Sequence, residues 1–310
     1  MDEIEARDEA LRRLTIFYER RNRELQQRTS PKAILKKLLC WKRISKKAKT
    51  FFKTLKYRAL KIKNVHETVD YMGVCPDVSN ADMSSFSEKR IVVYTCVTGS
   101  YDLIDEPVYQ DKAIEYVAFT DADPTKVMAP GWQIKQVPGF LLKKKPSYIN
   151  RYLKFHPNEF FADYDYAIYI DGNVIITGDI KPLLTCINSE TGLAMHTHSL
   201  RNCVYEEAKQ LLKIGRGNAQ AIKSQIQDYK SEGFPVEFGL LECTVIFTKI
   251  GLESKRIYDL WWEEFVRSNS QRDQLSLPYV LWKNRMTINS IGYLGSNVMN
   301  SPYFIVKAHL

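Results

Sequence analysis

From Lys89 onward, short apolar runs alternate with longer stretches of helical periodicity. The apolar runs are rich in β-branched and aromatic residues and end in polar turns, which is typical of buried strands. They predict strands within residues 89–102, 114–123, 131–138, 164–170, 190–199 and 239–249. Apolar residues three and four apart predict helices within residues 143–161, 200–215, 218–233 and 254–269. Alternating strands and helices indicate an α/β fold with a mostly parallel sheet flanked by helices.

The N-terminal part of the chain has a different pattern, which predicts a separate helical arm. Residues 2–28 indicate a helix in which Ile4, Leu11, Tyr18 and Leu25 recur every seven residues. The heptad pattern is incomplete, so a homo-oligomer formed through these helices and a solvated single helix both remain open.

Residues 31–65 predict a long amphipathic helix with apolar residues on one face and lysines on the other. The whole chain has a formal charge of +9, but residues 31–66 hold thirteen Lys or Arg and no acid, which leaves −4 for the remainder. Such an arm suits an anionic membrane surface. Docking on the body or on a partner helix, and binding to nucleic acid, are the alternatives.

Residues 66–88 are polar and interrupted by Gly, Pro, Ser and Asn, which predicts a linker. The expected organisation is therefore a basic arm over 1–65, a linker over 66–88 and an α/β domain over 89–310. Six cysteines occur without a CxxC pair, which favours a reducing compartment over a zinc site or a disulfide framework. The N-terminus has no apolar secretory segment. We expect a cytoplasmic protein, peripheral on the inner face of a membrane if the arm binds lipid.

Asp171, Gly172 and Asn173 interrupt an apolar segment directly after a predicted buried strand. A carboxylate next to a core needs a partner, because an unpaired buried charge is costly. Asp171 and Asn173 are two residues apart and point to the same side. Their oxygens can share one Mg²⁺ or Mn²⁺ ion, which prefers such ligands. The same tripeptide is also common turn chemistry, so both interpretations remain open.

Other polar residues gather at the ends of predicted strands, where open α/β sheets bind ligands. Arg151 and Lys154 share one helix face, and two neighbouring cations favour an anion such as a pyrophosphate between them, although a solvated basic face is the alternative. His198 and Arg201 follow a strand and indicate a polar pocket. Asp273 follows Arg272, so a buried salt bridge and a functional carboxylate are equally open there.

Six stretches occur in an order that resembles one family of proteins. They are "VYTCVTGSYD", "YVAFTD", "NRYLKFHPNEFFADYDYAIYIDGNVII", "HTHSLRNCVYEEA", "GLLECTVIFTK" and "RDQLSLPYVLW". The region from about residue 90 to 295 resembles nucleotide-sugar glycosyltransferases of the GT-A fold. It looks most like the glycosyltransferase-like domain family that includes bacterial polysaccharide-locus proteins and plant turgor-defect and mucilage-type proteins. The resemblance implies a GT-A-like fold.

The resemblance also assigns expected roles to individual residues. It places the metal-binding acidic motif at Asp171-Gly172-Asn173, with an amide in place of the second acid, and implies a Mn²⁺ or Mg²⁺ cofactor. A third metal ligand is expected from His309, near the C-terminus. The expected donor-binding residues are Thr98, Gly99, Ser100, Tyr101, Asp121, Arg151, Lys154, His156 and Gln274. The expected catalytic residues are Asp273, Glu242, His198 and Arg201, with Asp273 or Glu242 orienting sugar hydroxyls or acting as the base.

The expected function is a glycosyltransferase of the hexosyltransferase type in polysaccharide or capsule synthesis. It transfers sugar from a nucleotide-diphosphate donor, with a UDP-sugar favoured, to a glycan or lipid-linked acceptor. Two alternatives of other classes remain: a non-catalytic interaction protein that retains the fold, which the neutral Asn173 favours, and a nucleic-acid-binding protein led by the basic arm.

Overall fold

The computed structural model of the chain describes residues 75–99 and 101–307. These residues belong to one compact unit. The predicted arm over residues 1–65, with its oligomer, membrane, docking and nucleic-acid interpretations, lies outside the described residues, as do Ser100 and His309. Within the described part of the chain, no helix has the length and hydropathy that crossing a bilayer requires.

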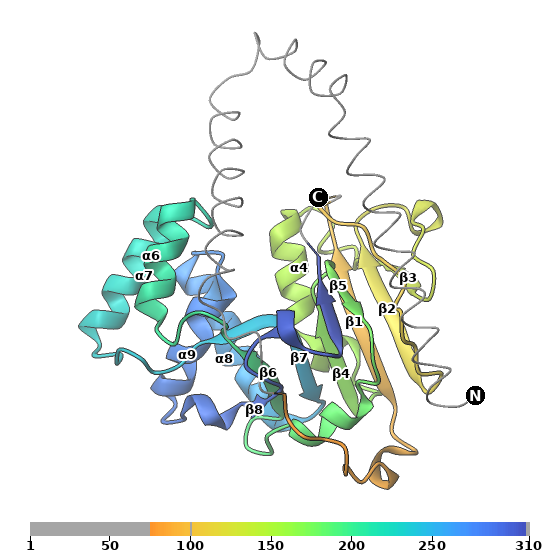
Figure 1. Cartoon of the computed structure of the whole chain (residues 1–310). Helices are drawn as coiled ribbons and strands as arrows, with labels where there is room; N and C mark the ends of the chain where they lie inside the picture. The colour runs from red at the N-terminus through yellow and green to blue at the C-terminus, as the bar shows by residue number, and fades with distance from the viewer. Residues whose placement is uncertain (1–74, 100, 308–310) are drawn as a thin grey trace, which may run out of the picture. The chain divides into compact units, whose positions relative to one another are not determined.

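A seven-stranded sheet with the order β3-β2-β1-β4-β7-β6-β8 forms the centre of this unit (Figure 1). Its strands are β1 (Ile91–Val97), β2 (Ile114–Thr120), β3 (Gln133–Gln136), β4 (Tyr166–Ile170), β6 (Leu193–Thr197), β7 (Leu241–Lys249) and β8 (Gly292–Tyr293). Every strand that the apolar pattern predicts is present. The apolar pattern did not predict β8, because its two residues are too few to show the alternation typical of a strand.

Strand direction brings several strand ends to one edge of the sheet. β1 pairs in parallel with β2 and β4, and β2 pairs in parallel with β3. β7 runs antiparallel between β4 and β6, so β6 points the same way as β4. The carboxyl ends of β1, β2, β4 and β6 therefore lie at the edge where β7 begins. The mostly parallel α/β class expected from the sequence is confirmed.

A second, two-stranded sheet lies beyond the Asp171-Gly172-Asn173 turn. It pairs β5 (Val174–Ile176) with β9 (Phe304–Val306) in antiparallel register. The backbone N–H of Lys307, just after β9, donates a hydrogen bond of 2.8 Å to the carbonyl of Asn173. The last described residues of the chain are thus held against the turn that follows β4.

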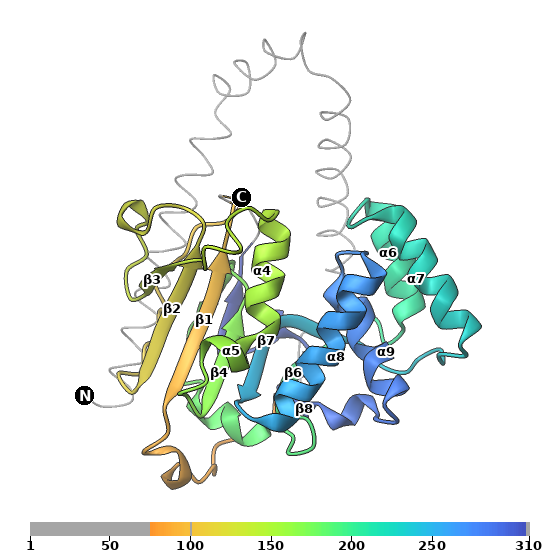
Figure 2. The same cartoon turned by 180° about the vertical axis from the view of Figure 1, so that it is seen from behind.

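Helices cover the sheet and extend it at one end. They are α4 (Pro146–Phe155), α5 (Pro157–Phe160), α6 (Val204–Ile214), α7 (Ala219–Ser231), α8 (Leu252–Ser268) and α9 (Asp273–Lys283). Short 3₁₀ helices are η2 (Ser84–Phe86), η3 (Pro124–Lys126), η4 (Lys181–Cys186), η5 (Ile288–Ser290) and η6 (Val298–Asn300). Figure 2 shows α4 and α8 on one face of the sheet.

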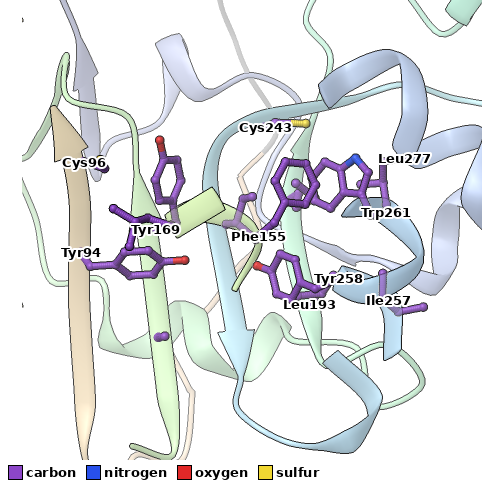
Figure 3. Close-up of a cluster of buried hydrophobic side chains, with 14 of the residues drawn as sticks. Tyr94, Cys96, Phe155, Tyr169, Leu193, Cys243, Ile257, Tyr258, Trp261 and Leu277 are labelled. Atoms are coloured by element: carbon purple, nitrogen blue, oxygen red, sulfur yellow. The ribbon is translucent and has the colours of Figure 1, made fainter. Parts of the chain in front are cut away.

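The strands divide their side chains between two cores, as a period of two requires. In β1, Val92 and Tyr94 join the core beneath α4, α8 and α9, whereas Ile91 and Val93 join the core beneath β5 and β9. Aromatic rings fill much of the first core (Figure 3). There the rings of Phe155 in α4 and Trp261 in α8 are 4.4 Å apart between centroids and meet edge to face.

The second half of the expected linker is packed on the body. Phe86 in η2 is buried in the second core, and its ring lies 5.6 Å from that of Tyr166 in β4. Val78 and Met83 pack against the same core. The folded body therefore begins before Lys89, because three apolar residues within the polar segment pack on the second core.

Candidate active site

The loop after β1 is fixed by bonds to neighbouring segments. Thr98 Oγ1 donates to the carbonyl oxygen of Pro146 at the start of α4, at 2.9 Å. Both carboxylate oxygens of Asp121, after β2, accept the Gly99 N–H at 3.1 and 2.9 Å. Asp121 thus holds the loop that was expected to face a nucleotide. Tyr101, farther along the loop, is exposed.

Asp171 lies directly after β4 and remains partly accessible, with 31% of its side chain exposed. Its Oδ1 accepts a hydrogen bond of 2.8 Å from the hydroxyl of Tyr169, two residues earlier in β4. Gly172 is required here by a close approach, because a Cβ atom at this position would overlap Cγ2 of Val97 at the end of β1. The carboxylate is therefore presented at a point where two parallel strands end side by side.

Asn173 is buried and oriented by the C-terminal segment. Its Nδ2 donates to the carbonyl oxygen of Lys307 at 2.7 Å, which fixes the side-chain amide. Its Oδ1 is also buried and has no hydrogen-bond partner among residues 75–99 and 101–307. A buried amide oxygen without a donor is unfavourable, and a cation or an ordered donor at that point would satisfy it.

A buried ionic network links α4 to the first turn of α9. Lys154 is 1% exposed, and its Nζ lies 2.7 Å from Oδ2 of Asp273 and 3.9 Å from Oδ1 of Asp171. Nε of Arg151, one turn earlier, lies 3.3 Å from Oδ2 of Asp273, without hydrogen-bond geometry. The network joins residues from the end of β4, from α4 and from α9. It places them at the carboxyl edge of the sheet.

The charges in this network are stable as ions. Burial by itself would raise the pKa of Asp273, but Arg151, Lys154 and Arg272 together hold it well below its usual range. Burial would lower the pKa of Arg151, and the carboxylates of Asp273 and Asp171 outweigh it and raise the pKa. A carboxylate this acidic is a poor proton acceptor near neutral pH. Asp273 is thus a charged anchor, which favours the salt-bridge interpretation over the general base.

Arg272 and Gln274 flank Asp273. The Nη2 of Arg272 donates to Oε1 of Gln274 at 3.3 Å, while its buried Nε has no hydrogen-bond partner in the described part of the chain. Burial lowers the pKa of Arg272 from its ordinary value, against the raising effect of Asp273. Three cations and two carboxylates therefore share the edge beside β4. The described residues leave the Nε groups of Arg151 and Arg272 without acceptors.

His198 and Arg201 both lie beside a carboxylate of α6. Glu207 in α6 accepts a 2.6 Å hydrogen bond from Nε of Arg201, and Nε2 of His198 lies 3.6 Å from the same oxygen. Nδ1 of His198 accepts the backbone N–H groups of Leu200 and Arg201 at 3.1 and 3.2 Å. The ring proton therefore belongs on Nε2, which faces Glu207.

A groove of about 410 Å³ opens beside this second group. Its lining includes His198, Arg201 and Glu206, together with the apolar Leu200 and Ile288. A mixed lining of this kind suits a hydroxylated ligand that also presents apolar faces.

Glu242, near the start of β7, accepts hydrogen bonds from two backbone N–H groups. Its two carboxylate oxygens accept the N–H groups of Ser199 and Val298 at 3.2 and 3.3 Å. It joins the loop after β6 to η6. These bonds make Glu242 a structural link at the same edge of the sheet.

Two histidines lie away from these groups. His156 follows the far end of α4, where its ring stacks on Tyr152 at 3.9 Å and burial lowers its pKa. The structure does not bring it to Arg151 and Asp171. His196 in β6 is buried against Phe304, and burial lowers its pKa to about 4. Neither ring nitrogen of His196 has a hydrogen-bond partner in the described part of the chain.

The chemistry of the Asp171-Gly172-Asn173 turn fits a hard divalent cation. Asp171 supplies an accessible carboxylate, and Asn173 supplies a buried oxygen that lacks a donor. Among the described residues, no cluster of three His, Cys, Asp or Glu side chains suited to a metal occurs. His309 lies outside them. One charged and one neutral ligand indicate a weaker site than a pair of carboxylates.

Sequence reasoning missed two contributors to these groups. Tyr169 looks like a core residue in an apolar run, yet its hydroxyl binds Asp171. Asn150 donates to the Cys96 carbonyl at 2.7 Å and accepts a short hydrogen bond from Arg151, so it positions that guanidinium. The position of Asn150 next to Arg151 is a signal in the sequence, whereas Tyr169 offers none.

Several solved glycosyltransferases are similar to the chain in structure. The bifunctional glycosyltransferase WbbM has 14% identity and a TM-score of 0.42, over 67% of this chain and 39% of that one. The galactosyltransferase LgtC, in complex with donor and acceptor sugar analogues, has 10% identity and a TM-score of 0.36, over 66% and 72%. GlyE of Streptococcus pneumoniae TIGR4 has 12% identity and a TM-score of 0.34, over 64% and 44%. The chain thus spans less than half of WbbM and of GlyE.

A family model described as "TOD1/MUCI70, glycosyltransferase-like domain" matches residues 40–292. No curated protein matches the sequence. The matched range includes both groups of polar residues at the carboxyl edge of the sheet, and the family's description supports a role in glycosyl transfer. The GT-A-like α/β fold expected from the sequence is confirmed, and the chain belongs to the TOD1/MUCI70 family of glycosyltransferase-like domains.

Proposed function

We propose that the protein transfers a hexose from a nucleotide-diphosphate donor, with a UDP-sugar as the first candidate, to a glycan or lipid-linked acceptor in polysaccharide synthesis. The observation that carries this proposal is the cationic group beside Asp171. The side chain of Arg151 is 23% exposed, and Arg272 is also partly exposed. The accessible part of each guanidinium can meet the oxygens of a diphosphate.

The donor would lie across the ends of β1 and β4. Its nucleoside would contact the loop of Thr98, Gly99 and Tyr101, which Asp121 holds in place. Its diphosphate would meet Arg151 and Arg272. Lys154 is too deeply buried to contact it and acts instead through Asp171 and Asp273.

Asp171 and Asn173 would hold a Mn²⁺ or Mg²⁺ ion. When bound, this ion would neutralise charge on the leaving diphosphate. The residues of the chain would supply the rest: Arg151 fixes the diphosphate, and the 410 Å³ groove beside His198 and Arg201 receives the acceptor. Proximity of the two bound molecules lowers the barrier to transfer.

The arm over 1–65 would keep the enzyme at the cytoplasmic face of a membrane, near lipid-linked acceptors. Self-association through residues 2–28 is a further proposal. Both rest on the sequence pattern, namely the thirteen cations within residues 31–66 and the partial heptad.

Release of UDP from a panel of UDP-sugars, with Mn²⁺ and with chelator, tests the proposal directly. We expect release with at least one donor and its loss in the Asp171→Ala variant. Nucleotide binding without turnover for every donor, with and without acceptor glycans, would favour the non-catalytic interaction protein, to which the neutral Asn173 also points.

A further inference from the structure

The loop between β3 and α4 is a fixed turn with apolar side chains on its outer surface. Val137 and Leu141 are buried and anchor it, whereas Phe140 is 57% and Leu142 is 43% exposed. The Leu141 N–H donates to the carbonyl of Pro138 at 2.9 Å, and the Lys144 N–H donates to that of Leu141 at 2.8 Å. The exposure of Phe140 and Leu142 is therefore imposed by an ordered turn around Leu141.

This loop is also strongly cationic. Lys143, Lys144 and Lys145 follow Leu142 directly, and all three are exposed. Between Asp123 and Glu159 the sequence contains no acidic residue. Lys144 is held near the loop surface, with its Nζ 5.7 Å from the ring centroid of Tyr148. Two exposed large apolar side chains suit the apolar part of a lipid surface, and the three lysines beside them suit its anionic headgroups.

The loop adjoins the candidate donor site. Its first residue is tied to β2, since the Val137 N–H donates to the carbonyl of Thr120 at 2.9 Å. Its last residues lead into Pro146, whose carbonyl accepts the Thr98 hydroxyl at 2.9 Å. The outer surface of the loop and the nucleotide-facing loop after β1 are thus at the same edge of the sheet.

We propose that residues 137–145 form a lipid-docking loop. Phe140 and Leu142 enter the interfacial region of an anionic bilayer, and Lys143, Lys144 and Lys145 contact its phosphate headgroups. This contact orients the carboxyl edge of the sheet toward the membrane. This loop is a different segment from the basic arm over residues 1–65, which lies outside the described residues. Docking through the loop does not depend on the chemistry of glycosyl transfer.

Vesicle flotation of the full-length protein tests the loop. The probes are phosphatidylcholine vesicles with and without phosphatidylglycerol. Phe140→Ser with Leu142→Ser removes the inserted side chains, and we expect partitioning to fall roughly tenfold. Lys143→Gln, Lys144→Gln and Lys145→Gln together remove three charges. We expect a loss of up to about a hundredfold, since each surface cation contributes about a fivefold factor.

Leu252→Ser with Val266→Ser is the matched control, because both residues are exposed apolar positions on α8. We expect no change in its partitioning. Backbone hydrogen exchange provides a local readout in the unaltered protein. Exchange within residues 137–145 should slow with phosphatidylglycerol vesicles and remain unchanged with phosphatidylcholine alone.

The proposal would be overturned if vesicles left hydrogen exchange in the loop unchanged. It would also be overturned if both loop variants floated as the unaltered protein does. Either result would leave the arm as the membrane contact. Protection by RNA but not by vesicles would overturn the proposal as well. Because these readouts are independent of UDP release, an inactive enzyme that still docks through the loop separates this proposal from the proposed function.

Discussion

Lys154 and Asp273 form a buried ion pair between α4 and α9, with Nζ and Oδ2 2.7 Å apart. The sequence suggested that Lys154 binds phosphate, but its ammonium is committed to this carboxylate and to Asp171 at 3.9 Å. It also lies 4.8 Å from the ring centroid of Tyr169. Lys154 is best described as a positioning residue, which sets where Asp171 and Asp273 lie relative to each other.

Replacing Lys154 with Met should destabilise the fold. Removing one partner of a buried ion pair leaves a buried charge, which typically costs about 3–5 kcal/mol. Arg151 and Arg272 remain near Asp273 and should keep the loss toward the lower value. Urea unfolding measures it. The double variant Lys154→Met with Asp273→Asn should recover part of the loss, and a double variant less stable than the single one would contradict this account.

Asp171→Ala should lower sugar transfer by at least about a hundredfold while the protein stays folded. The carboxylate is partly exposed, but the buried hydroxyl of Tyr169 loses its acceptor, which should cost about 1–3 kcal/mol of stability. Asn173→Asp is the companion variant. A second charged oxygen should strengthen Mn²⁺ binding, and weaker Mn²⁺ binding, measured by calorimetry, would show that Asn173 is not a ligand.

Arg151→Ala should weaken UDP binding by about 10- to 100-fold, in keeping with loss of a charged hydrogen bond. Uridine binding should change little, because the guanidinium would meet phosphate and not the base. Calorimetric titration with UDP and with uridine separates the two. Arg256→Ala, at an exposed position on α8, is the control. An equal loss of affinity for uridine would mean that Arg151 supports the fold and does not contact the phosphates.

Gly172→Ala should disturb both stability and donor binding, since its methyl group would overlap Cγ2 of Val97. Overpacking of this kind costs about 1–3 kcal/mol. Adding Val97→Ala removes the opposing atom and should restore most of the stability and of the UDP affinity. No recovery in the double variant would show that the contact with Val97 is not what requires glycine at this position.

Acid should destabilise the protein in part through His196. Burial lowers its pKa to about 4 from the ordinary 6.5, so below 6.5 the unfolded chain binds a proton that the folded chain does not. The stability contributed by neutral His196 is complete above pH 6.5. About 3 kcal/mol of it is lost as the pH falls toward 4. His196→Leu should flatten the dependence of the urea midpoint on pH in this interval, and parallel curves for the two proteins would refute the assignment.

The sequence predicted most of the sheet because its strands are apolar runs that end in turns. Helix α9 was missed, because Pro278 inside it and the short apolar run around it conceal helical periodicity. The apolar pattern also could not show that β7 is antiparallel to its neighbours, because the direction of a strand depends on connections between distant segments. For the same reason, Arg151 and Asp171 were identified as site residues, whereas the pairing of Lys154 with Asp273 was not.

The position of β9 has a consequence for how the protein matures. Asn173 obtains its partner from Lys307, which is 134 residues farther along the chain. All strands of the central sheet have left the ribosome before β9 does, so the sheet can assemble while the turn after β4 is still open. Competence to bind donor would then arise after the fold itself. A released chain truncated before residue 304 should keep the central sheet, although it lacks Phe304 of the second core, and should be unable to retain UDP. The C-terminal segment is thus a natural point at which to separate folding from activity.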